Sequence, residues 1–229
     1  MLIIVLTGNF KNFFSYFSLL FLHELGHSLM GIILGYQLDR IIFYPYGGVT
    51  TFNMPLNIPL KNELLVLLAG PFFQIIAYYL LKRFFNNLDI YHYSLLIFNL
   101  LPIYPLDGGK IFNILCNYSF NYLKSFTITF ILSIFFLFIL IIYSIQIHNF
   151  NLLLMVIVLF IKCLEFYKKR FYYYERFLLE RYLHQYSFSK FKNIKNIKNF
   201  YRDTHHYINY QEEKIILKKH FIRCKNTKM

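Results

Sequence analysis

Long apolar runs separated by short polar segments dominate the chain. Four of these runs approach or exceed the roughly 20 apolar residues that a helix needs to cross a bilayer. They are the segments 13–36, 63–81, 125–147 and 150–166. The third of them contains no charged residue at all. This pattern predicts an all-α polytopic membrane protein with about five to six transmembrane helices.

A fifth apolar run, 93–117, is interrupted in its middle. Pro102 and Pro105 break the helical pattern, and Asp107 opens a turn that continues with two glycines. Broken helix at membrane depth is tolerated only where it lines protein or a water-filled cavity, so this segment is expected to line a site. Residues 1–8 look like the end of another spanning helix, which is either truncated or begins upstream.

The polar segment 38–61 has a different pattern. β-Branched and aromatic residues flank the pair Gly47 and Gly48, which is a signal for a short β-hairpin. A membrane-associated hairpin must have its backbone groups paired or hydrated, and its unpaired edge could accept an extended segment of another chain. An ordinary interfacial loop is the alternative for this segment.

Composition excludes a single soluble domain of ordinary type, since 57% of the residues are hydrophobic and the mean hydropathy is +0.44. The formal charge of +13 is unevenly placed, with a net +2 over residues 1–165 and a net +11 over residues 166–229. Basic residues directly after the last apolar run indicate the cytoplasmic side. We therefore expect a transmembrane domain over 1–166 and a small basic cytoplasmic tail over 167–229, which contacts anionic lipid rather than nucleic acid.

The chemistry-bearing residues gather in the first apolar run. His23, Glu24 and His27 lie inside it, although ionisable side chains are expensive there unless they pair, line a cavity or bind an ion. Histidines four residues apart share one helix face, with about 5–6 Å between their β-carbons, and can bind one Zn²⁺. Glu24 projects roughly 100° away and is placed to take a proton from the attacking water. Paired histidines without a metal are the alternative.

A catalytic zinc site needs a third protein ligand and an open position. Glu63 begins a helix, where a carboxylate stabilises the N-terminus, and Glu165 lies at a membrane edge beside basic residues. Asp107 instead lies deep in the broken apolar segment and is the expected third ligand. The alternative role for Asp107 is to cap the helix that follows it. The three cysteines are scattered and give no thiolate site.

Two motifs together carry a resemblance to a known family. They are HELGH at 23–27 and NLLPIYPLDGG at 99–109. With the element AGP at 69–71 between them, they resemble the site-2 protease family of intramembrane zinc metalloproteases. Within the family, the segments 45–49 and 176–182 resemble the sporulation-type branch.

The resemblance implies roles for individual residues. Both histidines of HELGH and Asp107 would bind one zinc ion per chain, with the glutamate of the motif as the catalytic base. Asn99 matches a residue expected to hold substrate near the site. The hairpin at Gly47 and Gly48 matches an element expected to guide substrate as a strand.

Two features depart from the family pattern. Many relatives carry Asn near position 74, where this chain has Gln74. The branch's nucleotide-sensing domain, of the cystathionine-β-synthase type, is only faintly echoed at 200–221. The tail is therefore expected to be a degenerate remnant of such a domain, and its stretch 190–198 is expected to be a solvated basic linker.

The embedded site and the resemblance predict an intramembrane zinc metalloendopeptidase in the cell membrane. Its partners would be the bilayer and a membrane-tethered protein substrate, such as a transcription-factor precursor released by regulated intramembrane proteolysis. A membrane-protein inhibitor is a further candidate partner. The alternative is a catalytically inactive membrane scaffold or adaptor. A metal transporter is disfavoured, because its ionisable groups would follow a path rather than gather at one point.

Overall fold

The computed structural model describes residues 10–44, 47–85, 88–208 and 211–226. The helices of the apolar part are α2 (Phe10–Ile33), α3 (Leu60–Leu81), α4 (Leu88–Leu100), α5 (Asp107–Ser119), α6 (Tyr122–Gln146) and α7 (Phe150–Lys168). A hairpin of β1 (Gln37–Tyr44) and β2 (Gly47–Asn53) follows α2. The tail contains α8 (Arg170–Leu183), β3 (Lys190–Asn193), η1 (Ile197–Asn199), β4 (Thr204–Ile208), β5 (Gln211–Glu212) and α9 (Glu213–Asn226).

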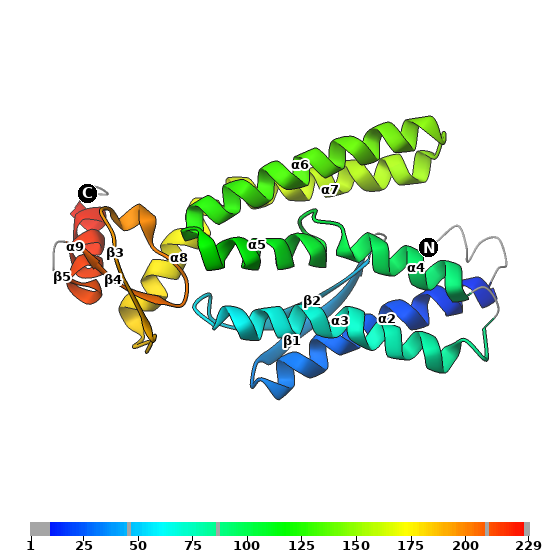
Figure 1. Cartoon of the computed structure of the whole chain (residues 1–229), viewed down its shortest axis with the longest axis horizontal. Coiled ribbons are helices and arrows are strands. Elements are labelled where there is room, and N and C mark those ends of the chain that lie inside the picture. Colours follow the sequence, from blue (N-terminus) through cyan, green and yellow to red (C-terminus); the bar gives the residue numbers. More distant parts are fainter. Residues whose placement is uncertain (1–9, 45–46, 86–87, 209–210, 227–229) are drawn as a thin grey trace.

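The helices of the apolar part run roughly along the long axis of the molecule, and the tail lies at one end of it (Figure 1). The α2 and α3 helices pack against each other, and the hairpin lies beside them. The α6 and α7 helices form an antiparallel pair whose short connection lies far from the tail. This arrangement places the start of α3, the end of α5 and the start of α6 next to the tail.

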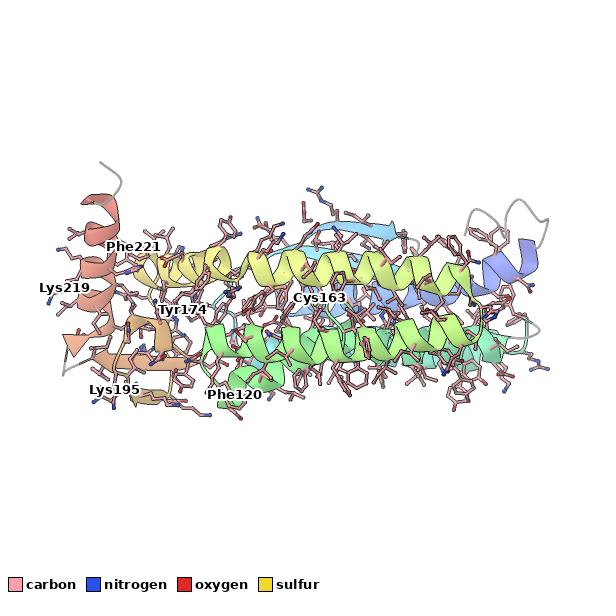
Figure 2. The ribbon with its side chains drawn as sticks, turned by 90° about the horizontal axis from the view of Figure 1, so that it is seen from above. Phe120, Cys163, Tyr174, Lys195, Lys219 and Phe221 are labelled. Atoms are coloured by element: carbon pink, nitrogen blue, oxygen red, sulfur yellow. The ribbon has the colours of Figure 1, made fainter. Side chains whose placement is uncertain are left out.

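Four helices in the described part of the chain are long and apolar enough to cross a membrane. They are Asn12–Ile33, Leu60–Leu81, Tyr122–Gln146 and Phe150–Lys168. In the most apolar windows of α6 and α7, the protein buries only 22% of the residues, so the apolar side chains face outward along both helices (Figure 2). Outward apolar faces of this size belong in lipid rather than in water.

The expected interruption of the run 93–117 is confirmed. The segment 101–106 separates α4 from α5, and each of these helices has only 13 residues, too few to cross a bilayer alone. Protein groups satisfy the backbone here: the Tyr104 N–H donates to Ser133 Oγ at 3.0 Å, and the Leu106 N–H donates to Ile103 O at 2.8 Å. The total of five to six spans stays a prediction, and residues 1–8 lie outside the described residues.

The predicted hairpin is confirmed over the loop alternative. Its strands pair antiparallel from Gln37 opposite Asn53 to Tyr44 opposite Gly47, with one irregularity between Leu38 and Arg40. The turn residues at 45–46 lie outside the described residues. The β2 strand contacts α2, which brings the glycine end of the hairpin to the helix that carries HELGH.

The expectation of a solvated linker over 190–198 is wrong for residues 190–193. Residues Lys190–Asn193 form a strand that pairs in parallel with β4, and β4 pairs antiparallel with β5. The side chains of β3 are exposed, as the charge pattern predicts. The partner strand begins more than ten residues later, however, and no local pattern reveals such pairing.

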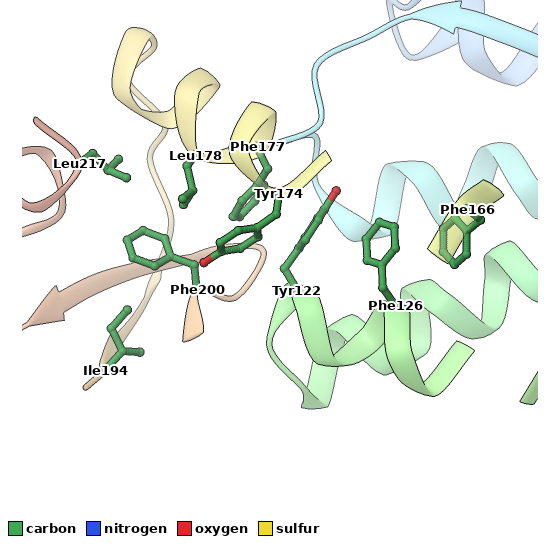
Figure 3. Packing of buried hydrophobic residues seen from close by; sticks show 9 residues of the cluster. All are labelled: Tyr122, Phe126, Phe166, Tyr174, Phe177, Leu178, Ile194, Phe200 and Leu217. Atoms are coloured by element: carbon green, nitrogen blue, oxygen red, sulfur yellow. The ribbon is translucent and has the colours of Figure 1, made fainter. Parts of the chain in front are cut away.

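One apolar cluster joins the tail to the membrane helices. Phe177, Phe200 and Leu217 of the tail are fully buried, and rings from α6 and α7 continue the cluster (Figure 3). Tyr122 of α6 stacks on Phe177 of α8 with 4.5 Å between ring centroids. The tail is therefore packed against the apolar part rather than tethered beside it.

Candidate metal centre

The α2 helix brings both histidines and the glutamate of HELGH to one buried site. His23, Glu24 and His27 are only 1%, 3% and 5% exposed. The two imidazole rings meet edge to face with 4.8 Å between centroids, as expected for one helical turn. One ligand atom from each of the three residues lies within 4.8 Å of the others.

Each imidazole is anchored through its Nδ1 atom. His27 Nδ1 lies 2.8 Å from Val66 O, and because a carbonyl only accepts, the ring must donate there. His23 Nδ1 lies 3.0 Å from Gln74 Oε1. The Gln74 amide donates through Nε2 to the backbone oxygen of His92 at 3.0 Å, which turns its own oxygen toward His23. Both rings therefore present a lone pair on Nε2.

Asp107 completes the set from the first turn of α5. Its Oδ2 lies 3.0 Å from His23 Nε2 and 3.1 Å from His27 Nε2, and the two nitrogens lie 3.2 Å apart. Three ligands of a tetrahedral Zn²⁺ at about 2.0–2.1 Å would be separated by about 3.3 Å. The three atoms are all electron-pair donors that face a common point. Their chemistry and spacing fit a zinc ion with one coordination position left open.

The capping alternative for Asp107 is not what the structure shows. The N-cap of α5 is Leu106, and no side chain caps this helix end. The second carboxylate oxygen of Asp107, Oδ1, lies 3.5 Å from Lys110 Nζ, one turn along α5. This contact holds Oδ1 away from the histidines and leaves Oδ2 for the metal.

Glu24 contacts the hairpin as well as lying beside the histidines. Thr50 Oγ1 of β2 donates to Glu24 Oε2 at 2.7 Å. A β-carbon on Gly48 would overlap the carboxyl carbon of Glu24, so a larger residue there would displace this carboxylate. On the other side, a β-carbon on Gly70 of α3 would overlap the His27 ring. Gly48 therefore allows the hairpin, and Gly70 allows α3, to lie close to the site on α2.

The predicted substrate-binding residues come together at the end of the hairpin. Asn99 is buried near the end of α4, and its Oδ1 lies 3.8 Å from where a β-carbon on Gly47 would be. A cavity of about 150 Å³ lies between Glu24, the β2 strand and Asp107. Open space therefore lies directly beside the site.

Several residues of this site were missed by the sequence analysis. Thr50, Lys110 and the Val66 carbonyl carry no motif signal, and Gln74 was noted only as a departure from the family pattern. Their contacts to the site bridge separate elements, apart from the pair of Lys110 and Asp107 within one turn of α5. Only that pair could have been found from spacing.

Comparisons with known proteins agree with this geometry. The chain is 30% identical over 190 residues to stage IV sporulation protein FB of Bacillus subtilis, covering 78% of this chain and 66% of that protein. It is 31% identical over 153 residues to a zinc metalloprotease of Methanocaldococcus jannaschii, covering 61% of this chain and 44% of that protein. The chain belongs to the site-2 protease family. No family model matches it.

A solved structure supports the assignment. The site-2 protease from Methanocaldococcus jannaschii superposes with a TM-score of 0.56 at 26% identity, over 69% of this chain and 77% of that one. Similarity to the sporulation protein agrees with the sporulation-type branch. The chain spans 66% of the length of the first relative and less than half of the second. Within the site-2 protease family, a zinc ion is the expected occupant of the centre.

Proposed function

We propose that this site-2 protease homologue is an intramembrane zinc metalloendopeptidase that cleaves a membrane-tethered protein. One observation carries the proposal: two histidine Nε2 atoms and Asp107 Oδ2 converge within 3.0–3.2 Å. Three protein ligands with an open position are typical of catalytic rather than structural zinc. A carboxylate that is not needed as a ligand, Glu24, lies next to them.

The residues around the metal divide the chemistry between them. Zn²⁺ bound by His23, His27 and Asp107 would polarise the scissile carbonyl and activate the attacking water. Glu24 takes the proton from that water and passes it to the leaving amine. Thr50 occupies one oxygen of this carboxylate, Oε2, so that Oε1 is left for the proton.

The hairpin provides a template for the substrate. A helical peptide hides its carbonyls in internal hydrogen bonds, so the cleaved segment must be extended. Among the described residues, β1 and β2 form a sheet of two strands, and β2 therefore has an edge without a strand partner. A substrate strand paired along it would pass Gly48 and Thr50 and lie beside Glu24. Asn99 and Gly47 would hold the segment where it leaves the hairpin.

The setting of the site gives the rest of the proposal. The chain would hold one zinc ion, cross the cell membrane several times and keep its basic tail in the cytoplasm. Cleavage would release a cytoplasmic fragment, such as a transcription-factor precursor. A membrane-protein inhibitor would bind the chain within the same membrane. The net charge of +11 over residues 166–229 supports this orientation.

The test is to compare cell membranes that contain the chain with membranes that contain Glu24→Gln. Tethered precursors should accumulate only with the variant, and the N-termini that cleavage creates should be absent from that sample. Removing a general base slows a reaction by about 10²- to 10⁴-fold. Glu175→Gln, an exposed residue of α8, is the matched control. Undiminished cleavage by Glu24→Gln would contradict the mechanism, and unchanged membranes with no bound zinc would favour an inactive scaffold.

A further inference from the structure

A second cavity adjoins the active site on the side of the tail. Its volume is about 260 Å³, which is far more than a packing defect and is large enough for a bound segment. Three residues, Met54, Glu63 and Lys110, line both this cavity and the one beside Glu24. The two cavities therefore adjoin, with these three residues between them, and a peptide segment that extends from the metal toward the tail would come to the second one.

Five aromatic side chains line this second cavity. We call it the aromatic cavity, and it is bounded by Tyr104, Tyr122, Phe126, Phe166, Tyr173 and Arg202. The rings of Tyr104 and Phe166 stack with 3.8 Å between centroids, and those of Phe126 and Phe166 with 4.6 Å. Figure 3 shows Tyr122, Phe126 and Phe166 following one another along this wall. Rings that support each other in this way give a preformed apolar surface.

Arg202 of the tail lines the aromatic cavity, and one of its donors is unused. The side chain is only 8% exposed. Its Nη1 donates to Glu63 Oε2 at 2.6 Å and its Nη2 to Ile58 O at 3.0 Å. Its Nε–H is buried and has no acceptor among the residues that the structure describes. A buried donor without a partner is unfavourable, so an acceptor that reaches this N–H would bind more tightly.

We propose that the aromatic cavity is a substrate subsite for the peptide segment on the tail side of the scissile bond. A large apolar side chain packs between the rings, and a backbone carbonyl of the same extended segment accepts from Arg202 Nε. Because Arg202 and Tyr173 belong to the tail, the tail completes the subsite. This inference rests on the proposed proteolytic function and adds to it a preference for large apolar residues beside the cleavage point.

The charges around the cavity favour a peptide over other occupants. Glu63 already neutralises Arg202, so a free anion would gain little there. A lipid acyl chain would leave the Arg202 Nε–H unpaired. It would also lie against the charged pair of Glu63 and Arg202, which is unfavourable for an apolar chain. An extended peptide offers both the apolar side chain and the neutral acceptor that this site lacks.

Photo-cross-linking tests where the peptide lies. Met54 is replaced by p-benzoylphenylalanine in the Glu24→Gln chain, and Met155 of α7, which lies outside both cavities, is replaced in the control. The expected result is a cross-link from position 54 to the precursors that accumulate with Glu24→Gln, mapped to residues beside their cleavage point, and none from position 155. Accumulation without that cross-link overturns the subsite alone. Absence of accumulation overturns the proposed function and the subsite with it.

A conservative variant tests the donor. Arg202→Lys keeps a positive charge for Glu63 but removes Nε, so KM for a purified accumulated precursor should rise about 3- to 10-fold, while kcat and zinc content stay unchanged. Arg83→Lys, at an exposed position just after the end of α3, is the control. Equal KM values for Arg202→Lys and the parent chain, with matching unfolding temperatures, would overturn the assignment of Arg202.

Discussion

Each histidine of the metal centre uses one ring nitrogen for the protein and leaves the other for the metal. Val66 O fixes His27, and the Gln74 amide, itself held by the His92 carbonyl, fixes His23. Such partners set both the tautomer and the ring orientation. The centre therefore depends on residues that never touch the metal.

Gln74→Leu should weaken zinc binding without removing a ligand. The His23 ring would lose the acceptor for its Nδ1–H and with it the preference for a lone pair on Nε2, which typically lowers metal affinity about 10- to 100-fold. Titration with a competing chelator measures the change. Gln146→Leu, exposed at the end of α6, should bind zinc as tightly as the parent chain; equal affinities for both variants would show that Gln74 has no such role.

Thr50→Val should slow catalysis while zinc content stays the same. Thr50 donates to the carboxylate of Glu24, and a hydrogen bond to a charged group contributes about 1.5–3 kcal/mol, so kcat should fall about 10- to 100-fold. The neighbouring Thr51 donates instead to Asp39 and to Arg40 O on the outer side of the hairpin. Thr51→Val is the control, and an equal loss in both variants would point to hairpin disruption instead.

At the scale of elements, the start of α3 is held from the tail. The N-cap residue of α3 is Pro59, which makes no side-chain cap. Asp203 Oδ2 instead accepts from the Leu60 N–H at 2.8 Å, and Glu180 Oε2 accepts from the Leu56 N–H at 2.7 Å. The connection from the hairpin to α3 is thus fixed by residues more than 120 positions later in the chain. Because α3 carries Val66 and Gly70, this fixation reaches the metal centre.

Asp203→Ala should destabilise this connection by about 1 kcal/mol, the usual loss when a side-chain acceptor at a helix start is removed. Asp203 has a positive φ of 50°, a conformation that Asn adopts readily. Asp203→Asn keeps an acceptor oxygen and tolerates a positive φ, so this variant should lose much less stability. Thermal unfolding in detergent compares the two, and equal losses would show that the contact to Leu60 does not contribute.

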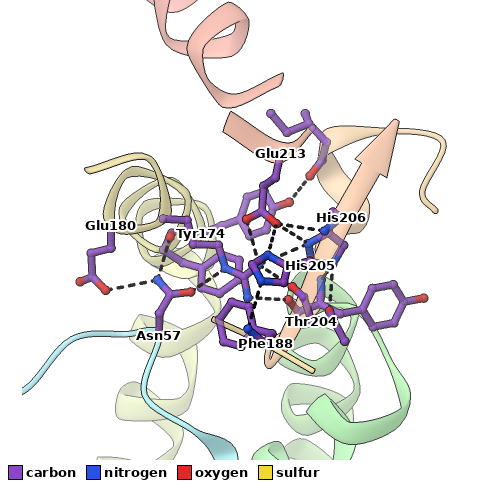
Figure 4. Close-up of polar contacts among 12 residues, drawn as sticks. Asn57, Tyr174, Glu180, Phe188, Thr204, His205, His206 and Glu213 are labelled. Atoms are coloured by element: carbon purple, nitrogen blue, oxygen red, sulfur yellow. Dashed lines mark hydrogen bonds and ion pairs between the residues drawn. The ribbon is translucent and has the colours of Figure 1, made fainter. Parts of the chain in front are cut away.

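At the scale of the whole molecule, a buried polar cluster locks the tail together and against the membrane part. Arg181 donates to Asn57 Oδ1 at 2.7 Å and to Glu213 Oε1 at 3.0 Å. Figure 4 shows Asn57, from the connection before α3, beside Glu180 at one side of the cluster, with His206 and Glu213 of the tail at the other side. The His206 side chain is fully buried, and its Nε2 accepts from the Tyr201 N–H at 2.9 Å.

Acidification should weaken the packing of the tail. Burial lowers the pKa of His206 below its ordinary value of 6.5, and the charge of Arg181 adds to this, against the opposing effect of Glu213. The unfolded tail therefore binds a proton first as pH falls. The contribution of neutral His206 to the stability of the folded tail is complete above pH 6.5 and is lost progressively as the pH falls below this value. Amide hydrogen exchange in Thr204–Ile208, corrected for intrinsic rates, should show falling protection between pH 7.5 and about 5.5.

His206→Gln is the comparison for this experiment, since its amide can still accept from Tyr201 but does not titrate. In this variant, the protection of Thr204–Ile208 against amide exchange should stay constant over the same pH interval. Parallel losses of protection in both chains would assign the pH dependence to another group.

Local patterns along the chain predict the membrane helices, the hairpin and four residues of the centre. The HELGH spacing identifies both histidines and Glu24, and the proline-broken run singles out Asp107, because a carboxylate there needs a partner. The parts that the sequence does not reveal depend on distant pairing. The β3 strand needs β4, Glu63 needs Arg202, and Gln74 gains its role only when α3 lies against α2. From the sequence, Glu63 was expected only to stabilise the N-terminus of its own helix.

The most direct test of the account is the zinc content of the purified chain. The parent chain should hold about one zinc ion, and Asp107→Ala should hold almost none, since loss of one of three protein ligands leaves a site that cannot compete for the metal. Asp89→Ala, a carboxylate at the start of α4 away from the centre, should keep the full zinc content. Zinc retained by Asp107→Ala at the level of the parent chain would contradict the proposed metal centre.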